Sequence, residues 1–162
     1  MRILHVITTL YIGGAEKLMV DLLPRMKAAG HHVELCVFDG THTSFYAQLE
    51  KAGIRIHSLH KGGSVYNPLN IFYLWRLMCK EWDIVHTHNT APQLFAAFGR
   101  VLCSVILVTT EHNTSNRRRN WKCYAWLDRW MYRQYKKVIC ISDQAANNHC
   151  KYIGEKDSQN VC

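Results

Sequence analysis

Short apolar segments alternate with longer amphipathic segments along this chain, and this alternation constrains the fold more than any other feature. The apolar segments are typical of buried parallel strands, and the amphipathic ones have the period of helices that cover a sheet. The pattern predicts an α/β fold with a doubly wound, mainly parallel sheet and helices on both faces. Strands are expected at 3–8, 32–38, 54–59, 83–87, 105–109 and 138–141, with a further strand beginning at 160–162. Helices are expected from 15, over 43–52 and 68–81, up to 100, over 121–137, and from 143.

Length and composition favour one folded domain that spans residues 1–162. The 162 residues include 48% apolar residues, which suffices for a buried core. Met1 leads directly into the first strand, and no secretory segment precedes it. The longest apolar run, Val101–Val108, is too short to cross a bilayer. We therefore expect a soluble, cytoplasmic protein.

The first strand leads into a glycine pair and then a helix. Gly13 and Gly14 lie between the strand that ends near Thr8 and the helix that begins at Ala15. Glycines let the backbone approach a ligand closely, and the N-terminus of the helix offers free N–H groups and a positive dipole end. This pattern favours an anion such as phosphate, although a tight turn with no ligand also accounts for it.

Polar residues follow most of the predicted strands. In a parallel sheet the carboxyl ends of the strands meet at one edge, where ligands bind. The convergence of several such ends with a glycine loop predicts a binding site there. These residues are Thr9, Tyr11, Gly13, Gly14, Asp39, Gly40, His60, Thr87, His88, Asn89, Glu111, His112, Asn113, Ser142 and Asp143.

Cysteines and histidines are numerous, but their spacing does not predict a metal centre. The seven cysteines have no CxxC spacing and are expected to be reduced thiols. His86 and His88 would lie on one face of a strand, yet no third ligand stands at a metal-like spacing. We therefore predict no metal and no cofactor.

Positive charge is concentrated near the C-terminal end of the chain. Residues 117–137 hold eight Lys or Arg residues against the single Asp128, and the rest of the chain is nearly neutral. In a continuous helix, four cations fall within an arc of roughly 60°, with two tryptophans at its border. Such a face is typical of a helix that contacts anionic lipid, although a solvated basic face is an equal alternative. No nucleic-acid reading motif is present. The predicted membrane-facing residues are Lys122, Trp126, Arg129, Trp130, Arg133 and Lys136.

Five segments together resemble a known family. These segments are Met1–Val6, Gly13–Glu16, Asp83–Asn89, Thr110–Asn113 and Val138–Ser142. Their order and spacing resemble the amino-terminal domain of family 4 glycosyltransferases over essentially the whole chain. The resemblance implies the GT-B architecture, in which two Rossmann-like domains enclose the active site. It also implies transfer of a sugar from a nucleotide-sugar donor, with retention of configuration and without a bound metal.

The resemblance implies roles for individual residues. Gly13 and Gly14 match the loop beside the donor diphosphate and sugar, and His112 matches the histidine that contacts the donor sugar and supports the reaction. A glycan or lipid-linked acceptor, as in surface polysaccharide synthesis, is implied on the other side of the site. An anionic membrane surface is a further expected partner, with peripheral contact at its inner face. The predicted acceptor-side residues are Thr9, Tyr11, His88, Asn89, Asn113, Arg117, Arg118 and Arg119.

The resemblance extends over one domain only. The carboxy-terminal nucleotide-sugar domain is absent from the 162 residues, so we expect this chain alone to be inactive. The alternative is a non-catalytic Rossmann-type nucleotide-binding or regulatory module, in which Asp39 would contact a ribose. The missing third glycine of GxGxxG argues against a dinucleotide ligand.

Overall fold

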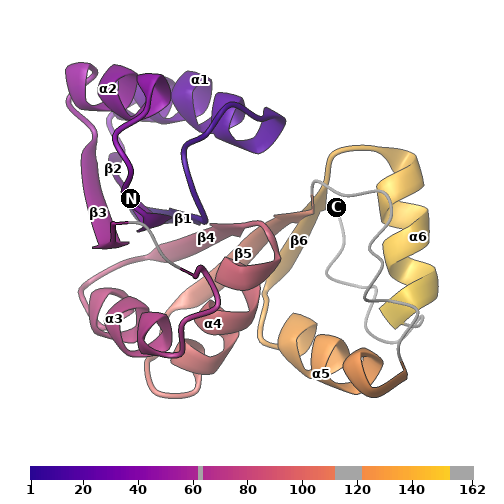
Figure 1. Ribbon diagram of the computed structural model, residues 1–162. Helices are drawn as coiled ribbons and strands as arrows, with labels where there is room; N and C mark the ends of the chain where they lie inside the picture. The colour runs from indigo at the N-terminus through magenta and orange to yellow at the C-terminus, as the bar shows by residue number, and fades with distance from the viewer. Residues whose placement is uncertain (62–63, 112–121, 154–162) are drawn as a thin grey trace.

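The computed structural model describes residues 1–61, 64–111 and 122–153. Within these residues six strands form one parallel sheet in the order β3-β2-β1-β4-β5-β6 (Figure 1). The predicted doubly wound α/β fold is therefore confirmed. The strands are β1 (Arg2–Ile7), β2 (His32–Asp39), β3 (Arg55–His60), β4 (Ile84–His88), β5 (Ile106–Glu111) and β6 (Lys137–Cys140). The helices are α1 (Gly14–Ala28), α2 (Ser44–Lys51), α3 (Leu69–Met78), α4 (Thr90–Arg100), α5 (Lys122–Arg133) and α6 (Asp143–Ile153).

The sheet separates two apolar cores, because alternate residues of each strand point to opposite faces. Ile3 and Ile7 of β1 pack with α1 and α2, whereas Leu4 and Val6 pack on the other side with α3, α4 and α5. Figure 1 shows α1 and α2 above the sheet and α3, α4 and α5 below it, while α6 lies beside β6. The strands therefore lie between helices that pack on both faces of the sheet.

The structure corrects two details of the predicted helices. The apolar period of this segment predicts that Leu18 faces the core together with Leu22 and Met26, but in α1 the buried residues are Ala15, Met19 and Leu23, and Leu18 is 38% exposed. α5 ends at Arg133 instead of reaching position 137, and the backbone N–H of Lys136 donates to the carbonyl of Leu107 (2.8 Å). The tail of the predicted helix is therefore the connection into β6.

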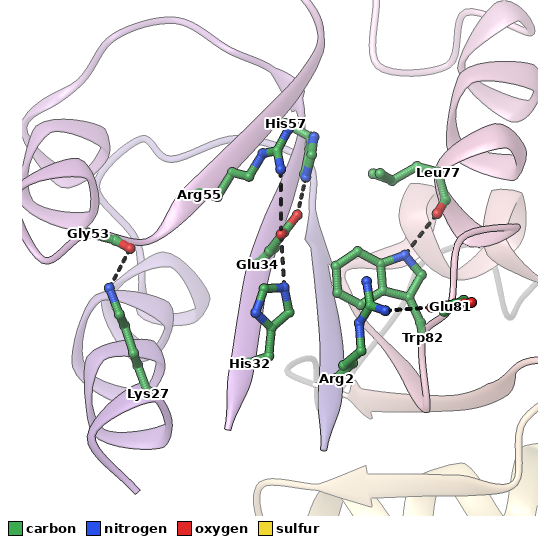
Figure 2. Close-up of polar contacts among 10 residues, drawn as sticks. All are labelled: Arg2, Lys27, His32, Glu34, Gly53, Arg55, His57, Leu77, Glu81 and Trp82. Carbon is green, nitrogen blue, oxygen red and sulfur yellow. Dashed lines mark hydrogen bonds and ion pairs between the residues drawn. The ribbon is translucent and has the colours of Figure 1, made fainter. Parts of the chain in front are cut away.

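A buried carboxylate joins β2 to β3 at the edge of the sheet (Figure 2). Glu34 accepts hydrogen bonds from His57 and from His32 (3.0 Å), and Arg55 lies 3.9 Å away. Burial raises the pKa of Glu34, but the bond and charge of His57, with smaller effects from His32 and Arg55, outweigh it. The net pKa of this carboxyl is below its usual value. Glu34 is therefore ionised at neutral pH and ties the two strands together.

Candidate functional site

The carboxyl ends of β1 and β4 meet at the point where the strand order reverses. β1 pairs with β2 on one side and with β4 on the other, so the connections that leave β1 and β4 go to opposite faces of the sheet. Asn89 Nδ2 donates to Thr8 Oγ1 (2.9 Å) and joins the two strand ends. A switch point of this kind is where open α/β sheets bind their ligands.

The glycine pair lies at this switch point, at the N-terminus of α1. Gly13 is the N-cap residue in an extended conformation, and its carbonyl accepts the first helical bond, from Lys17 N (2.9 Å). A Cβ on Gly14 would meet no atom within 4 Å, so neither crowding nor backbone conformation requires a glycine there. A Cβ on Gly13 would meet the flexible side chain of Glu16. The space over Gly14 therefore gives a ligand direct access to the backbone at the positive end of α1.

The loop before the glycine pair presents its side chains to solvent. Tyr11 is 51% exposed and Ile12 is 87% exposed, while Thr9 is half-buried. Thr43 Oγ1 donates to the carbonyl of Leu10 (2.6 Å) and fastens the base of the loop to the segment before α2. The exposed tip is thus free to contact a ligand, while its base is held.

Asn89 carries backbone strain at the same edge. It is the non-glycine residue with a positive φ in the described part of the chain, with φ 71° and ψ 159°. This region is essentially reserved for glycine, and such strain costs of order 1–3 kcal/mol. Strain of this kind gathers at functional sites, and here it aims the Asn89 amide at Thr8.

His88 is the last residue of β4 and is fully buried. Its ring stacks on that of His5 (centroids 5.5 Å apart) and contacts that of His86 (4.4 Å). His5 is the partner that sequence analysis missed: it stands opposite His86 in the register of β1 and β4. Burial, and secondly the nearby His86, lowers the pKa of His5 to about 3. These three residues, His5, His86 and His88, form a histidine cluster on one face of the sheet.

The end of β5 is anchored by a buried polar network. Tyr132 Oη donates to Glu111 Oε2 (2.8 Å), and Gln93 Nε2 lies 3.3 Å from the same oxygen. Gln93 Nε2 also donates to Thr109 Oγ1 (2.8 Å). β5 is thereby fixed to α4 and α5 up to the residue before His112. The predicted residues His112, Asn113, Arg117, Arg118 and Arg119 themselves lie outside the described residues.

The residues predicted to form a basic face on α5 differ in how exposed they are. Arg129 and Arg133 are exposed and Trp126 is 74% exposed, but Trp130 is half-buried against Phe98 (ring centroids 4.9 Å apart). Lys136 is exposed but follows the end of the helix, and the side chain of Lys122 is outside the described part. No helix among the described residues combines the length and the apolar character that crossing a membrane requires.

Solved structures with the same fold include several enzymes that handle sugars. HepE from Anabaena in complex with UDP superposes with a TM-score of 0.75 at 15% identity, over 100% of this chain and 43% of HepE. A glycosyltransferase from Rickettsia africae gives 0.69 at 22% identity, over 99% and 41% of the two chains. A putative UDP-N-acetylglucosamine 2-epimerase from Listeria monocytogenes gives 0.66 at 14% identity, over 98% and 43%. The chain therefore spans less than half the length of these neighbours.

Sequence comparisons are more specific than the shared fold. A search of curated proteins finds no match. The model of Glycosyltransferase Family 4, however, matches residues 12–159, which include the glycine pair and the strand ends of β4, β5 and β6. Because the match covers most of the chain, this protein belongs to glycosyltransferase family 4.

Proposed function

We propose that this chain is the amino-terminal, acceptor-side domain of a retaining glycosyltransferase that takes its sugar from a nucleotide-sugar donor. One observation carries the proposal: the backbone at Gly14 is open to a ligand at the N-terminus of α1, at the switch point of a sheet that the family model covers. The structural neighbours in complex with UDP and with UDP-glucose support a donor of this chemical class.

The N-terminus of α1 is suited to the charge that develops during sugar transfer. Retaining transfer passes through an oxocarbenium-like state while negative charge builds on the leaving diphosphate. N–H groups in the first turn of a helix have no intrahelical acceptor and stabilise such charge without a metal. The carboxylate of Glu16 already lies beside Gly13, so the diphosphate would displace it from the helix terminus.

His112 is the proposed catalytic residue. It follows β5, whose end is fixed by the bonds to Glu111, and a histidine there can hydrogen-bond the donor sugar and hold it for reaction. His112→Ala in the full-length enzyme should lower turnover by ~10²-fold or more, while leaving the stability of this domain nearly unchanged. A kinetic assay beside thermal unfolding measures both. Intact turnover, or an unfolded domain, would assign His112 a structural role.

The acceptor is proposed to be a glycan or a lipid-linked molecule that enters on the side of Tyr11 and Asn89, with the arginines at 117–119 as further acceptor-binding residues. Arginine suits this task because its planar fork grips phosphate oxygens in pairs. The acceptor would approach along the basic surface of α5, as in surface polysaccharide synthesis at the inner face of a membrane.

The rival proposal is a regulatory nucleotide-binding module that performs no transfer. Asp39 would contact a ribose in that case, but its Oδ1 accepts bonds from Thr41 N (3.0 Å) and Thr41 Oγ1 (2.7 Å) and closes a turn. Calorimetric titration distinguishes the two proposals. This chain should not bind NAD, and a protein extended by the second domain should bind a UDP-sugar. Tight NAD binding by this chain would support the rival.

A further inference from the structure

The histidine cluster brings three imidazoles from two strands to one place on the α1 side of the sheet. His5 lies on the central strand β1, and His86 and His88 lie two residues apart on β4. One ring nitrogen from each histidine lies within 4.8 Å of the corresponding nitrogen of both others. His5 and His88 are fully buried, and His86 is half-buried.

The separation of two nitrogens in the cluster matches that of two ligands around a transition-metal ion. His5 Nδ1 and His88 Nε2 lie 3.2 Å apart. Two nitrogens that bind one tetrahedral zinc at 2.0–2.1 Å are separated by roughly 3.3 Å. His86 Nε2 is 2.8 Å from Thr110 Oγ1, and a hydroxyl partner of this kind fixes the orientation of a ligand ring.

One nitrogen of the cluster has no hydrogen-bond partner among the residues that the structure describes. His5 Nε2 is buried and makes no hydrogen bond, which is costly for a polar atom in the core. Nδ1 is the His5 nitrogen that faces His88, so His5 would bind an ion through Nδ1 and keep its proton on Nε2.

From this geometry we propose that His5, His86 and His88 form a binding site for Zn²⁺ or a similar divalent transition-metal ion. Three imidazoles leave one tetrahedral position for water or another oxygen ligand. The ion would join β1 to β4 beneath the switch point. It would stabilise the sheet and take no part in the sugar transfer proposed above.

Equilibrium dialysis of the metal-stripped 162-residue chain against Zn²⁺ tests this site. We expect one tightly bound zinc per chain and a higher unfolding temperature with zinc. His86→Gln and His5→Gln should each weaken binding by at least ~10-fold, the loss known even for partners of ligands. Because His86 is only half-buried, His86→Gln should fold, and it tests the zinc site if His5→Gln does not fold.

Two control variants separate this site from other zinc-binding groups. His42→Gln changes an exposed histidine paired with Glu50, and Cys103→Ser removes a thiol that interacts with Cys79. Neither should change the stoichiometry. Co²⁺ in place of zinc should give a tetrahedral spectrum without a thiolate charge-transfer band. Unchanged zinc binding in His86→Gln, a thiolate band, or no zinc uptake at all would overturn the proposal.

Discussion

At the scale of single residues, Gly14 separates a requirement of the fold from a requirement of function. Its φ is not positive and its Cβ position is open, so Gly14→Ala should fold and be as stable as the parent, or more so by up to about 1 kcal/mol. In the proposed two-domain enzyme the added methyl group would stand where the donor is proposed to approach the backbone. We expect a loss of transfer of ~10-fold or more, measured as kcat/KM for the donor.

Gly30 provides the matched control for this prediction. A Cβ there also meets nothing within 4 Å, but its φ is +86°. Gly30→Ala should therefore destabilise the domain by about 1 kcal/mol and leave transfer unchanged. Equal kinetics for the Gly14→Ala and Gly30→Ala enzymes would remove the role assigned to Gly14.

Glu34 predicts how stability depends on pH. Since its pKa is lowered in the folded state, its contribution is present above the pKa of the unfolded chain and is lost as pH falls through the folded value. Glu34→Gln should cost about 1–3 kcal/mol at pH 7 and less in acid. Urea unfolding from pH 7 to pH 3 measures this.

Glu50→Gln is the comparison variant for Glu34, because Glu50 also bonds a histidine, His42 (2.9 Å), but at the exposed surface. Its loss should cost less than about 1 kcal/mol. Similar losses for the two variants, or a loss for Glu34→Gln that does not change with pH, would contradict the role given to burial.

The sequence predicted which residues follow the strands at this edge of the sheet, but not that His5 contacts His86 and His88. Alternation along β4 showed that His86 and His88 share a face, and this needs only the period of a strand. His5 is more than eighty positions away, and its place opposite His86 depends on β1 and β4 being neighbours. Pairing of distant strands is a property of topology, so spacing along the chain could not reveal it.

At the scale of elements, α5 carries the proposed membrane contact. Each cation near an anionic bilayer contributes ~1 kcal/mol, so Arg129 and Arg133 with neighbouring cations could bind it reversibly. The chain should sediment with anionic vesicles at low salt, dissociate at high salt, and not bind neutral vesicles. Arg129→Glu with Arg133→Glu should abolish sedimentation while circular dichroism stays unchanged.

A double variant with the same change of charge controls for net charge. Arg25→Glu with Lys51→Glu alters exposed residues of α1 and α2, on the opposite face of the sheet. It should retain vesicle binding. Equal loss in both double variants would indicate attraction by overall charge, and binding to neutral vesicles would exclude the electrostatic account.

Elements were predicted more accurately than their ends. The apolar period located all the described strands and helices, because burial against a sheet imposes that period. The predicted end of α5 was wrong. Lys136 and Lys137 continue the helical pattern of charge, but Lys137 belongs to β6, where it pairs with Val108. Charged residues at a helix end carry little information about where it stops.

At the scale of the whole molecule, the site is assembled from strand ends that are far apart in the sequence. β1 and β4 supply the switch point, and β5 leads to the proposed catalytic histidine. The chain covers 43% of HepE, and closure of two domains around a donor is how such sites exclude water and complete their contacts. A domain with one wall of such a site should bind nucleotide-sugars weakly.

Sugar transfer measured side by side for this 162-residue chain and for a protein extended by the second domain tests the central claim most directly. We expect the extended protein to transfer sugar from a nucleotide-sugar donor with retention of configuration, and the 162-residue chain to show no transfer. Transfer by the short chain at a rate near that of the extended protein would contradict the assignment of this chain as one half of the enzyme. No transfer by the extended protein, whichever nucleotide-sugar is supplied, would contradict the proposed function itself.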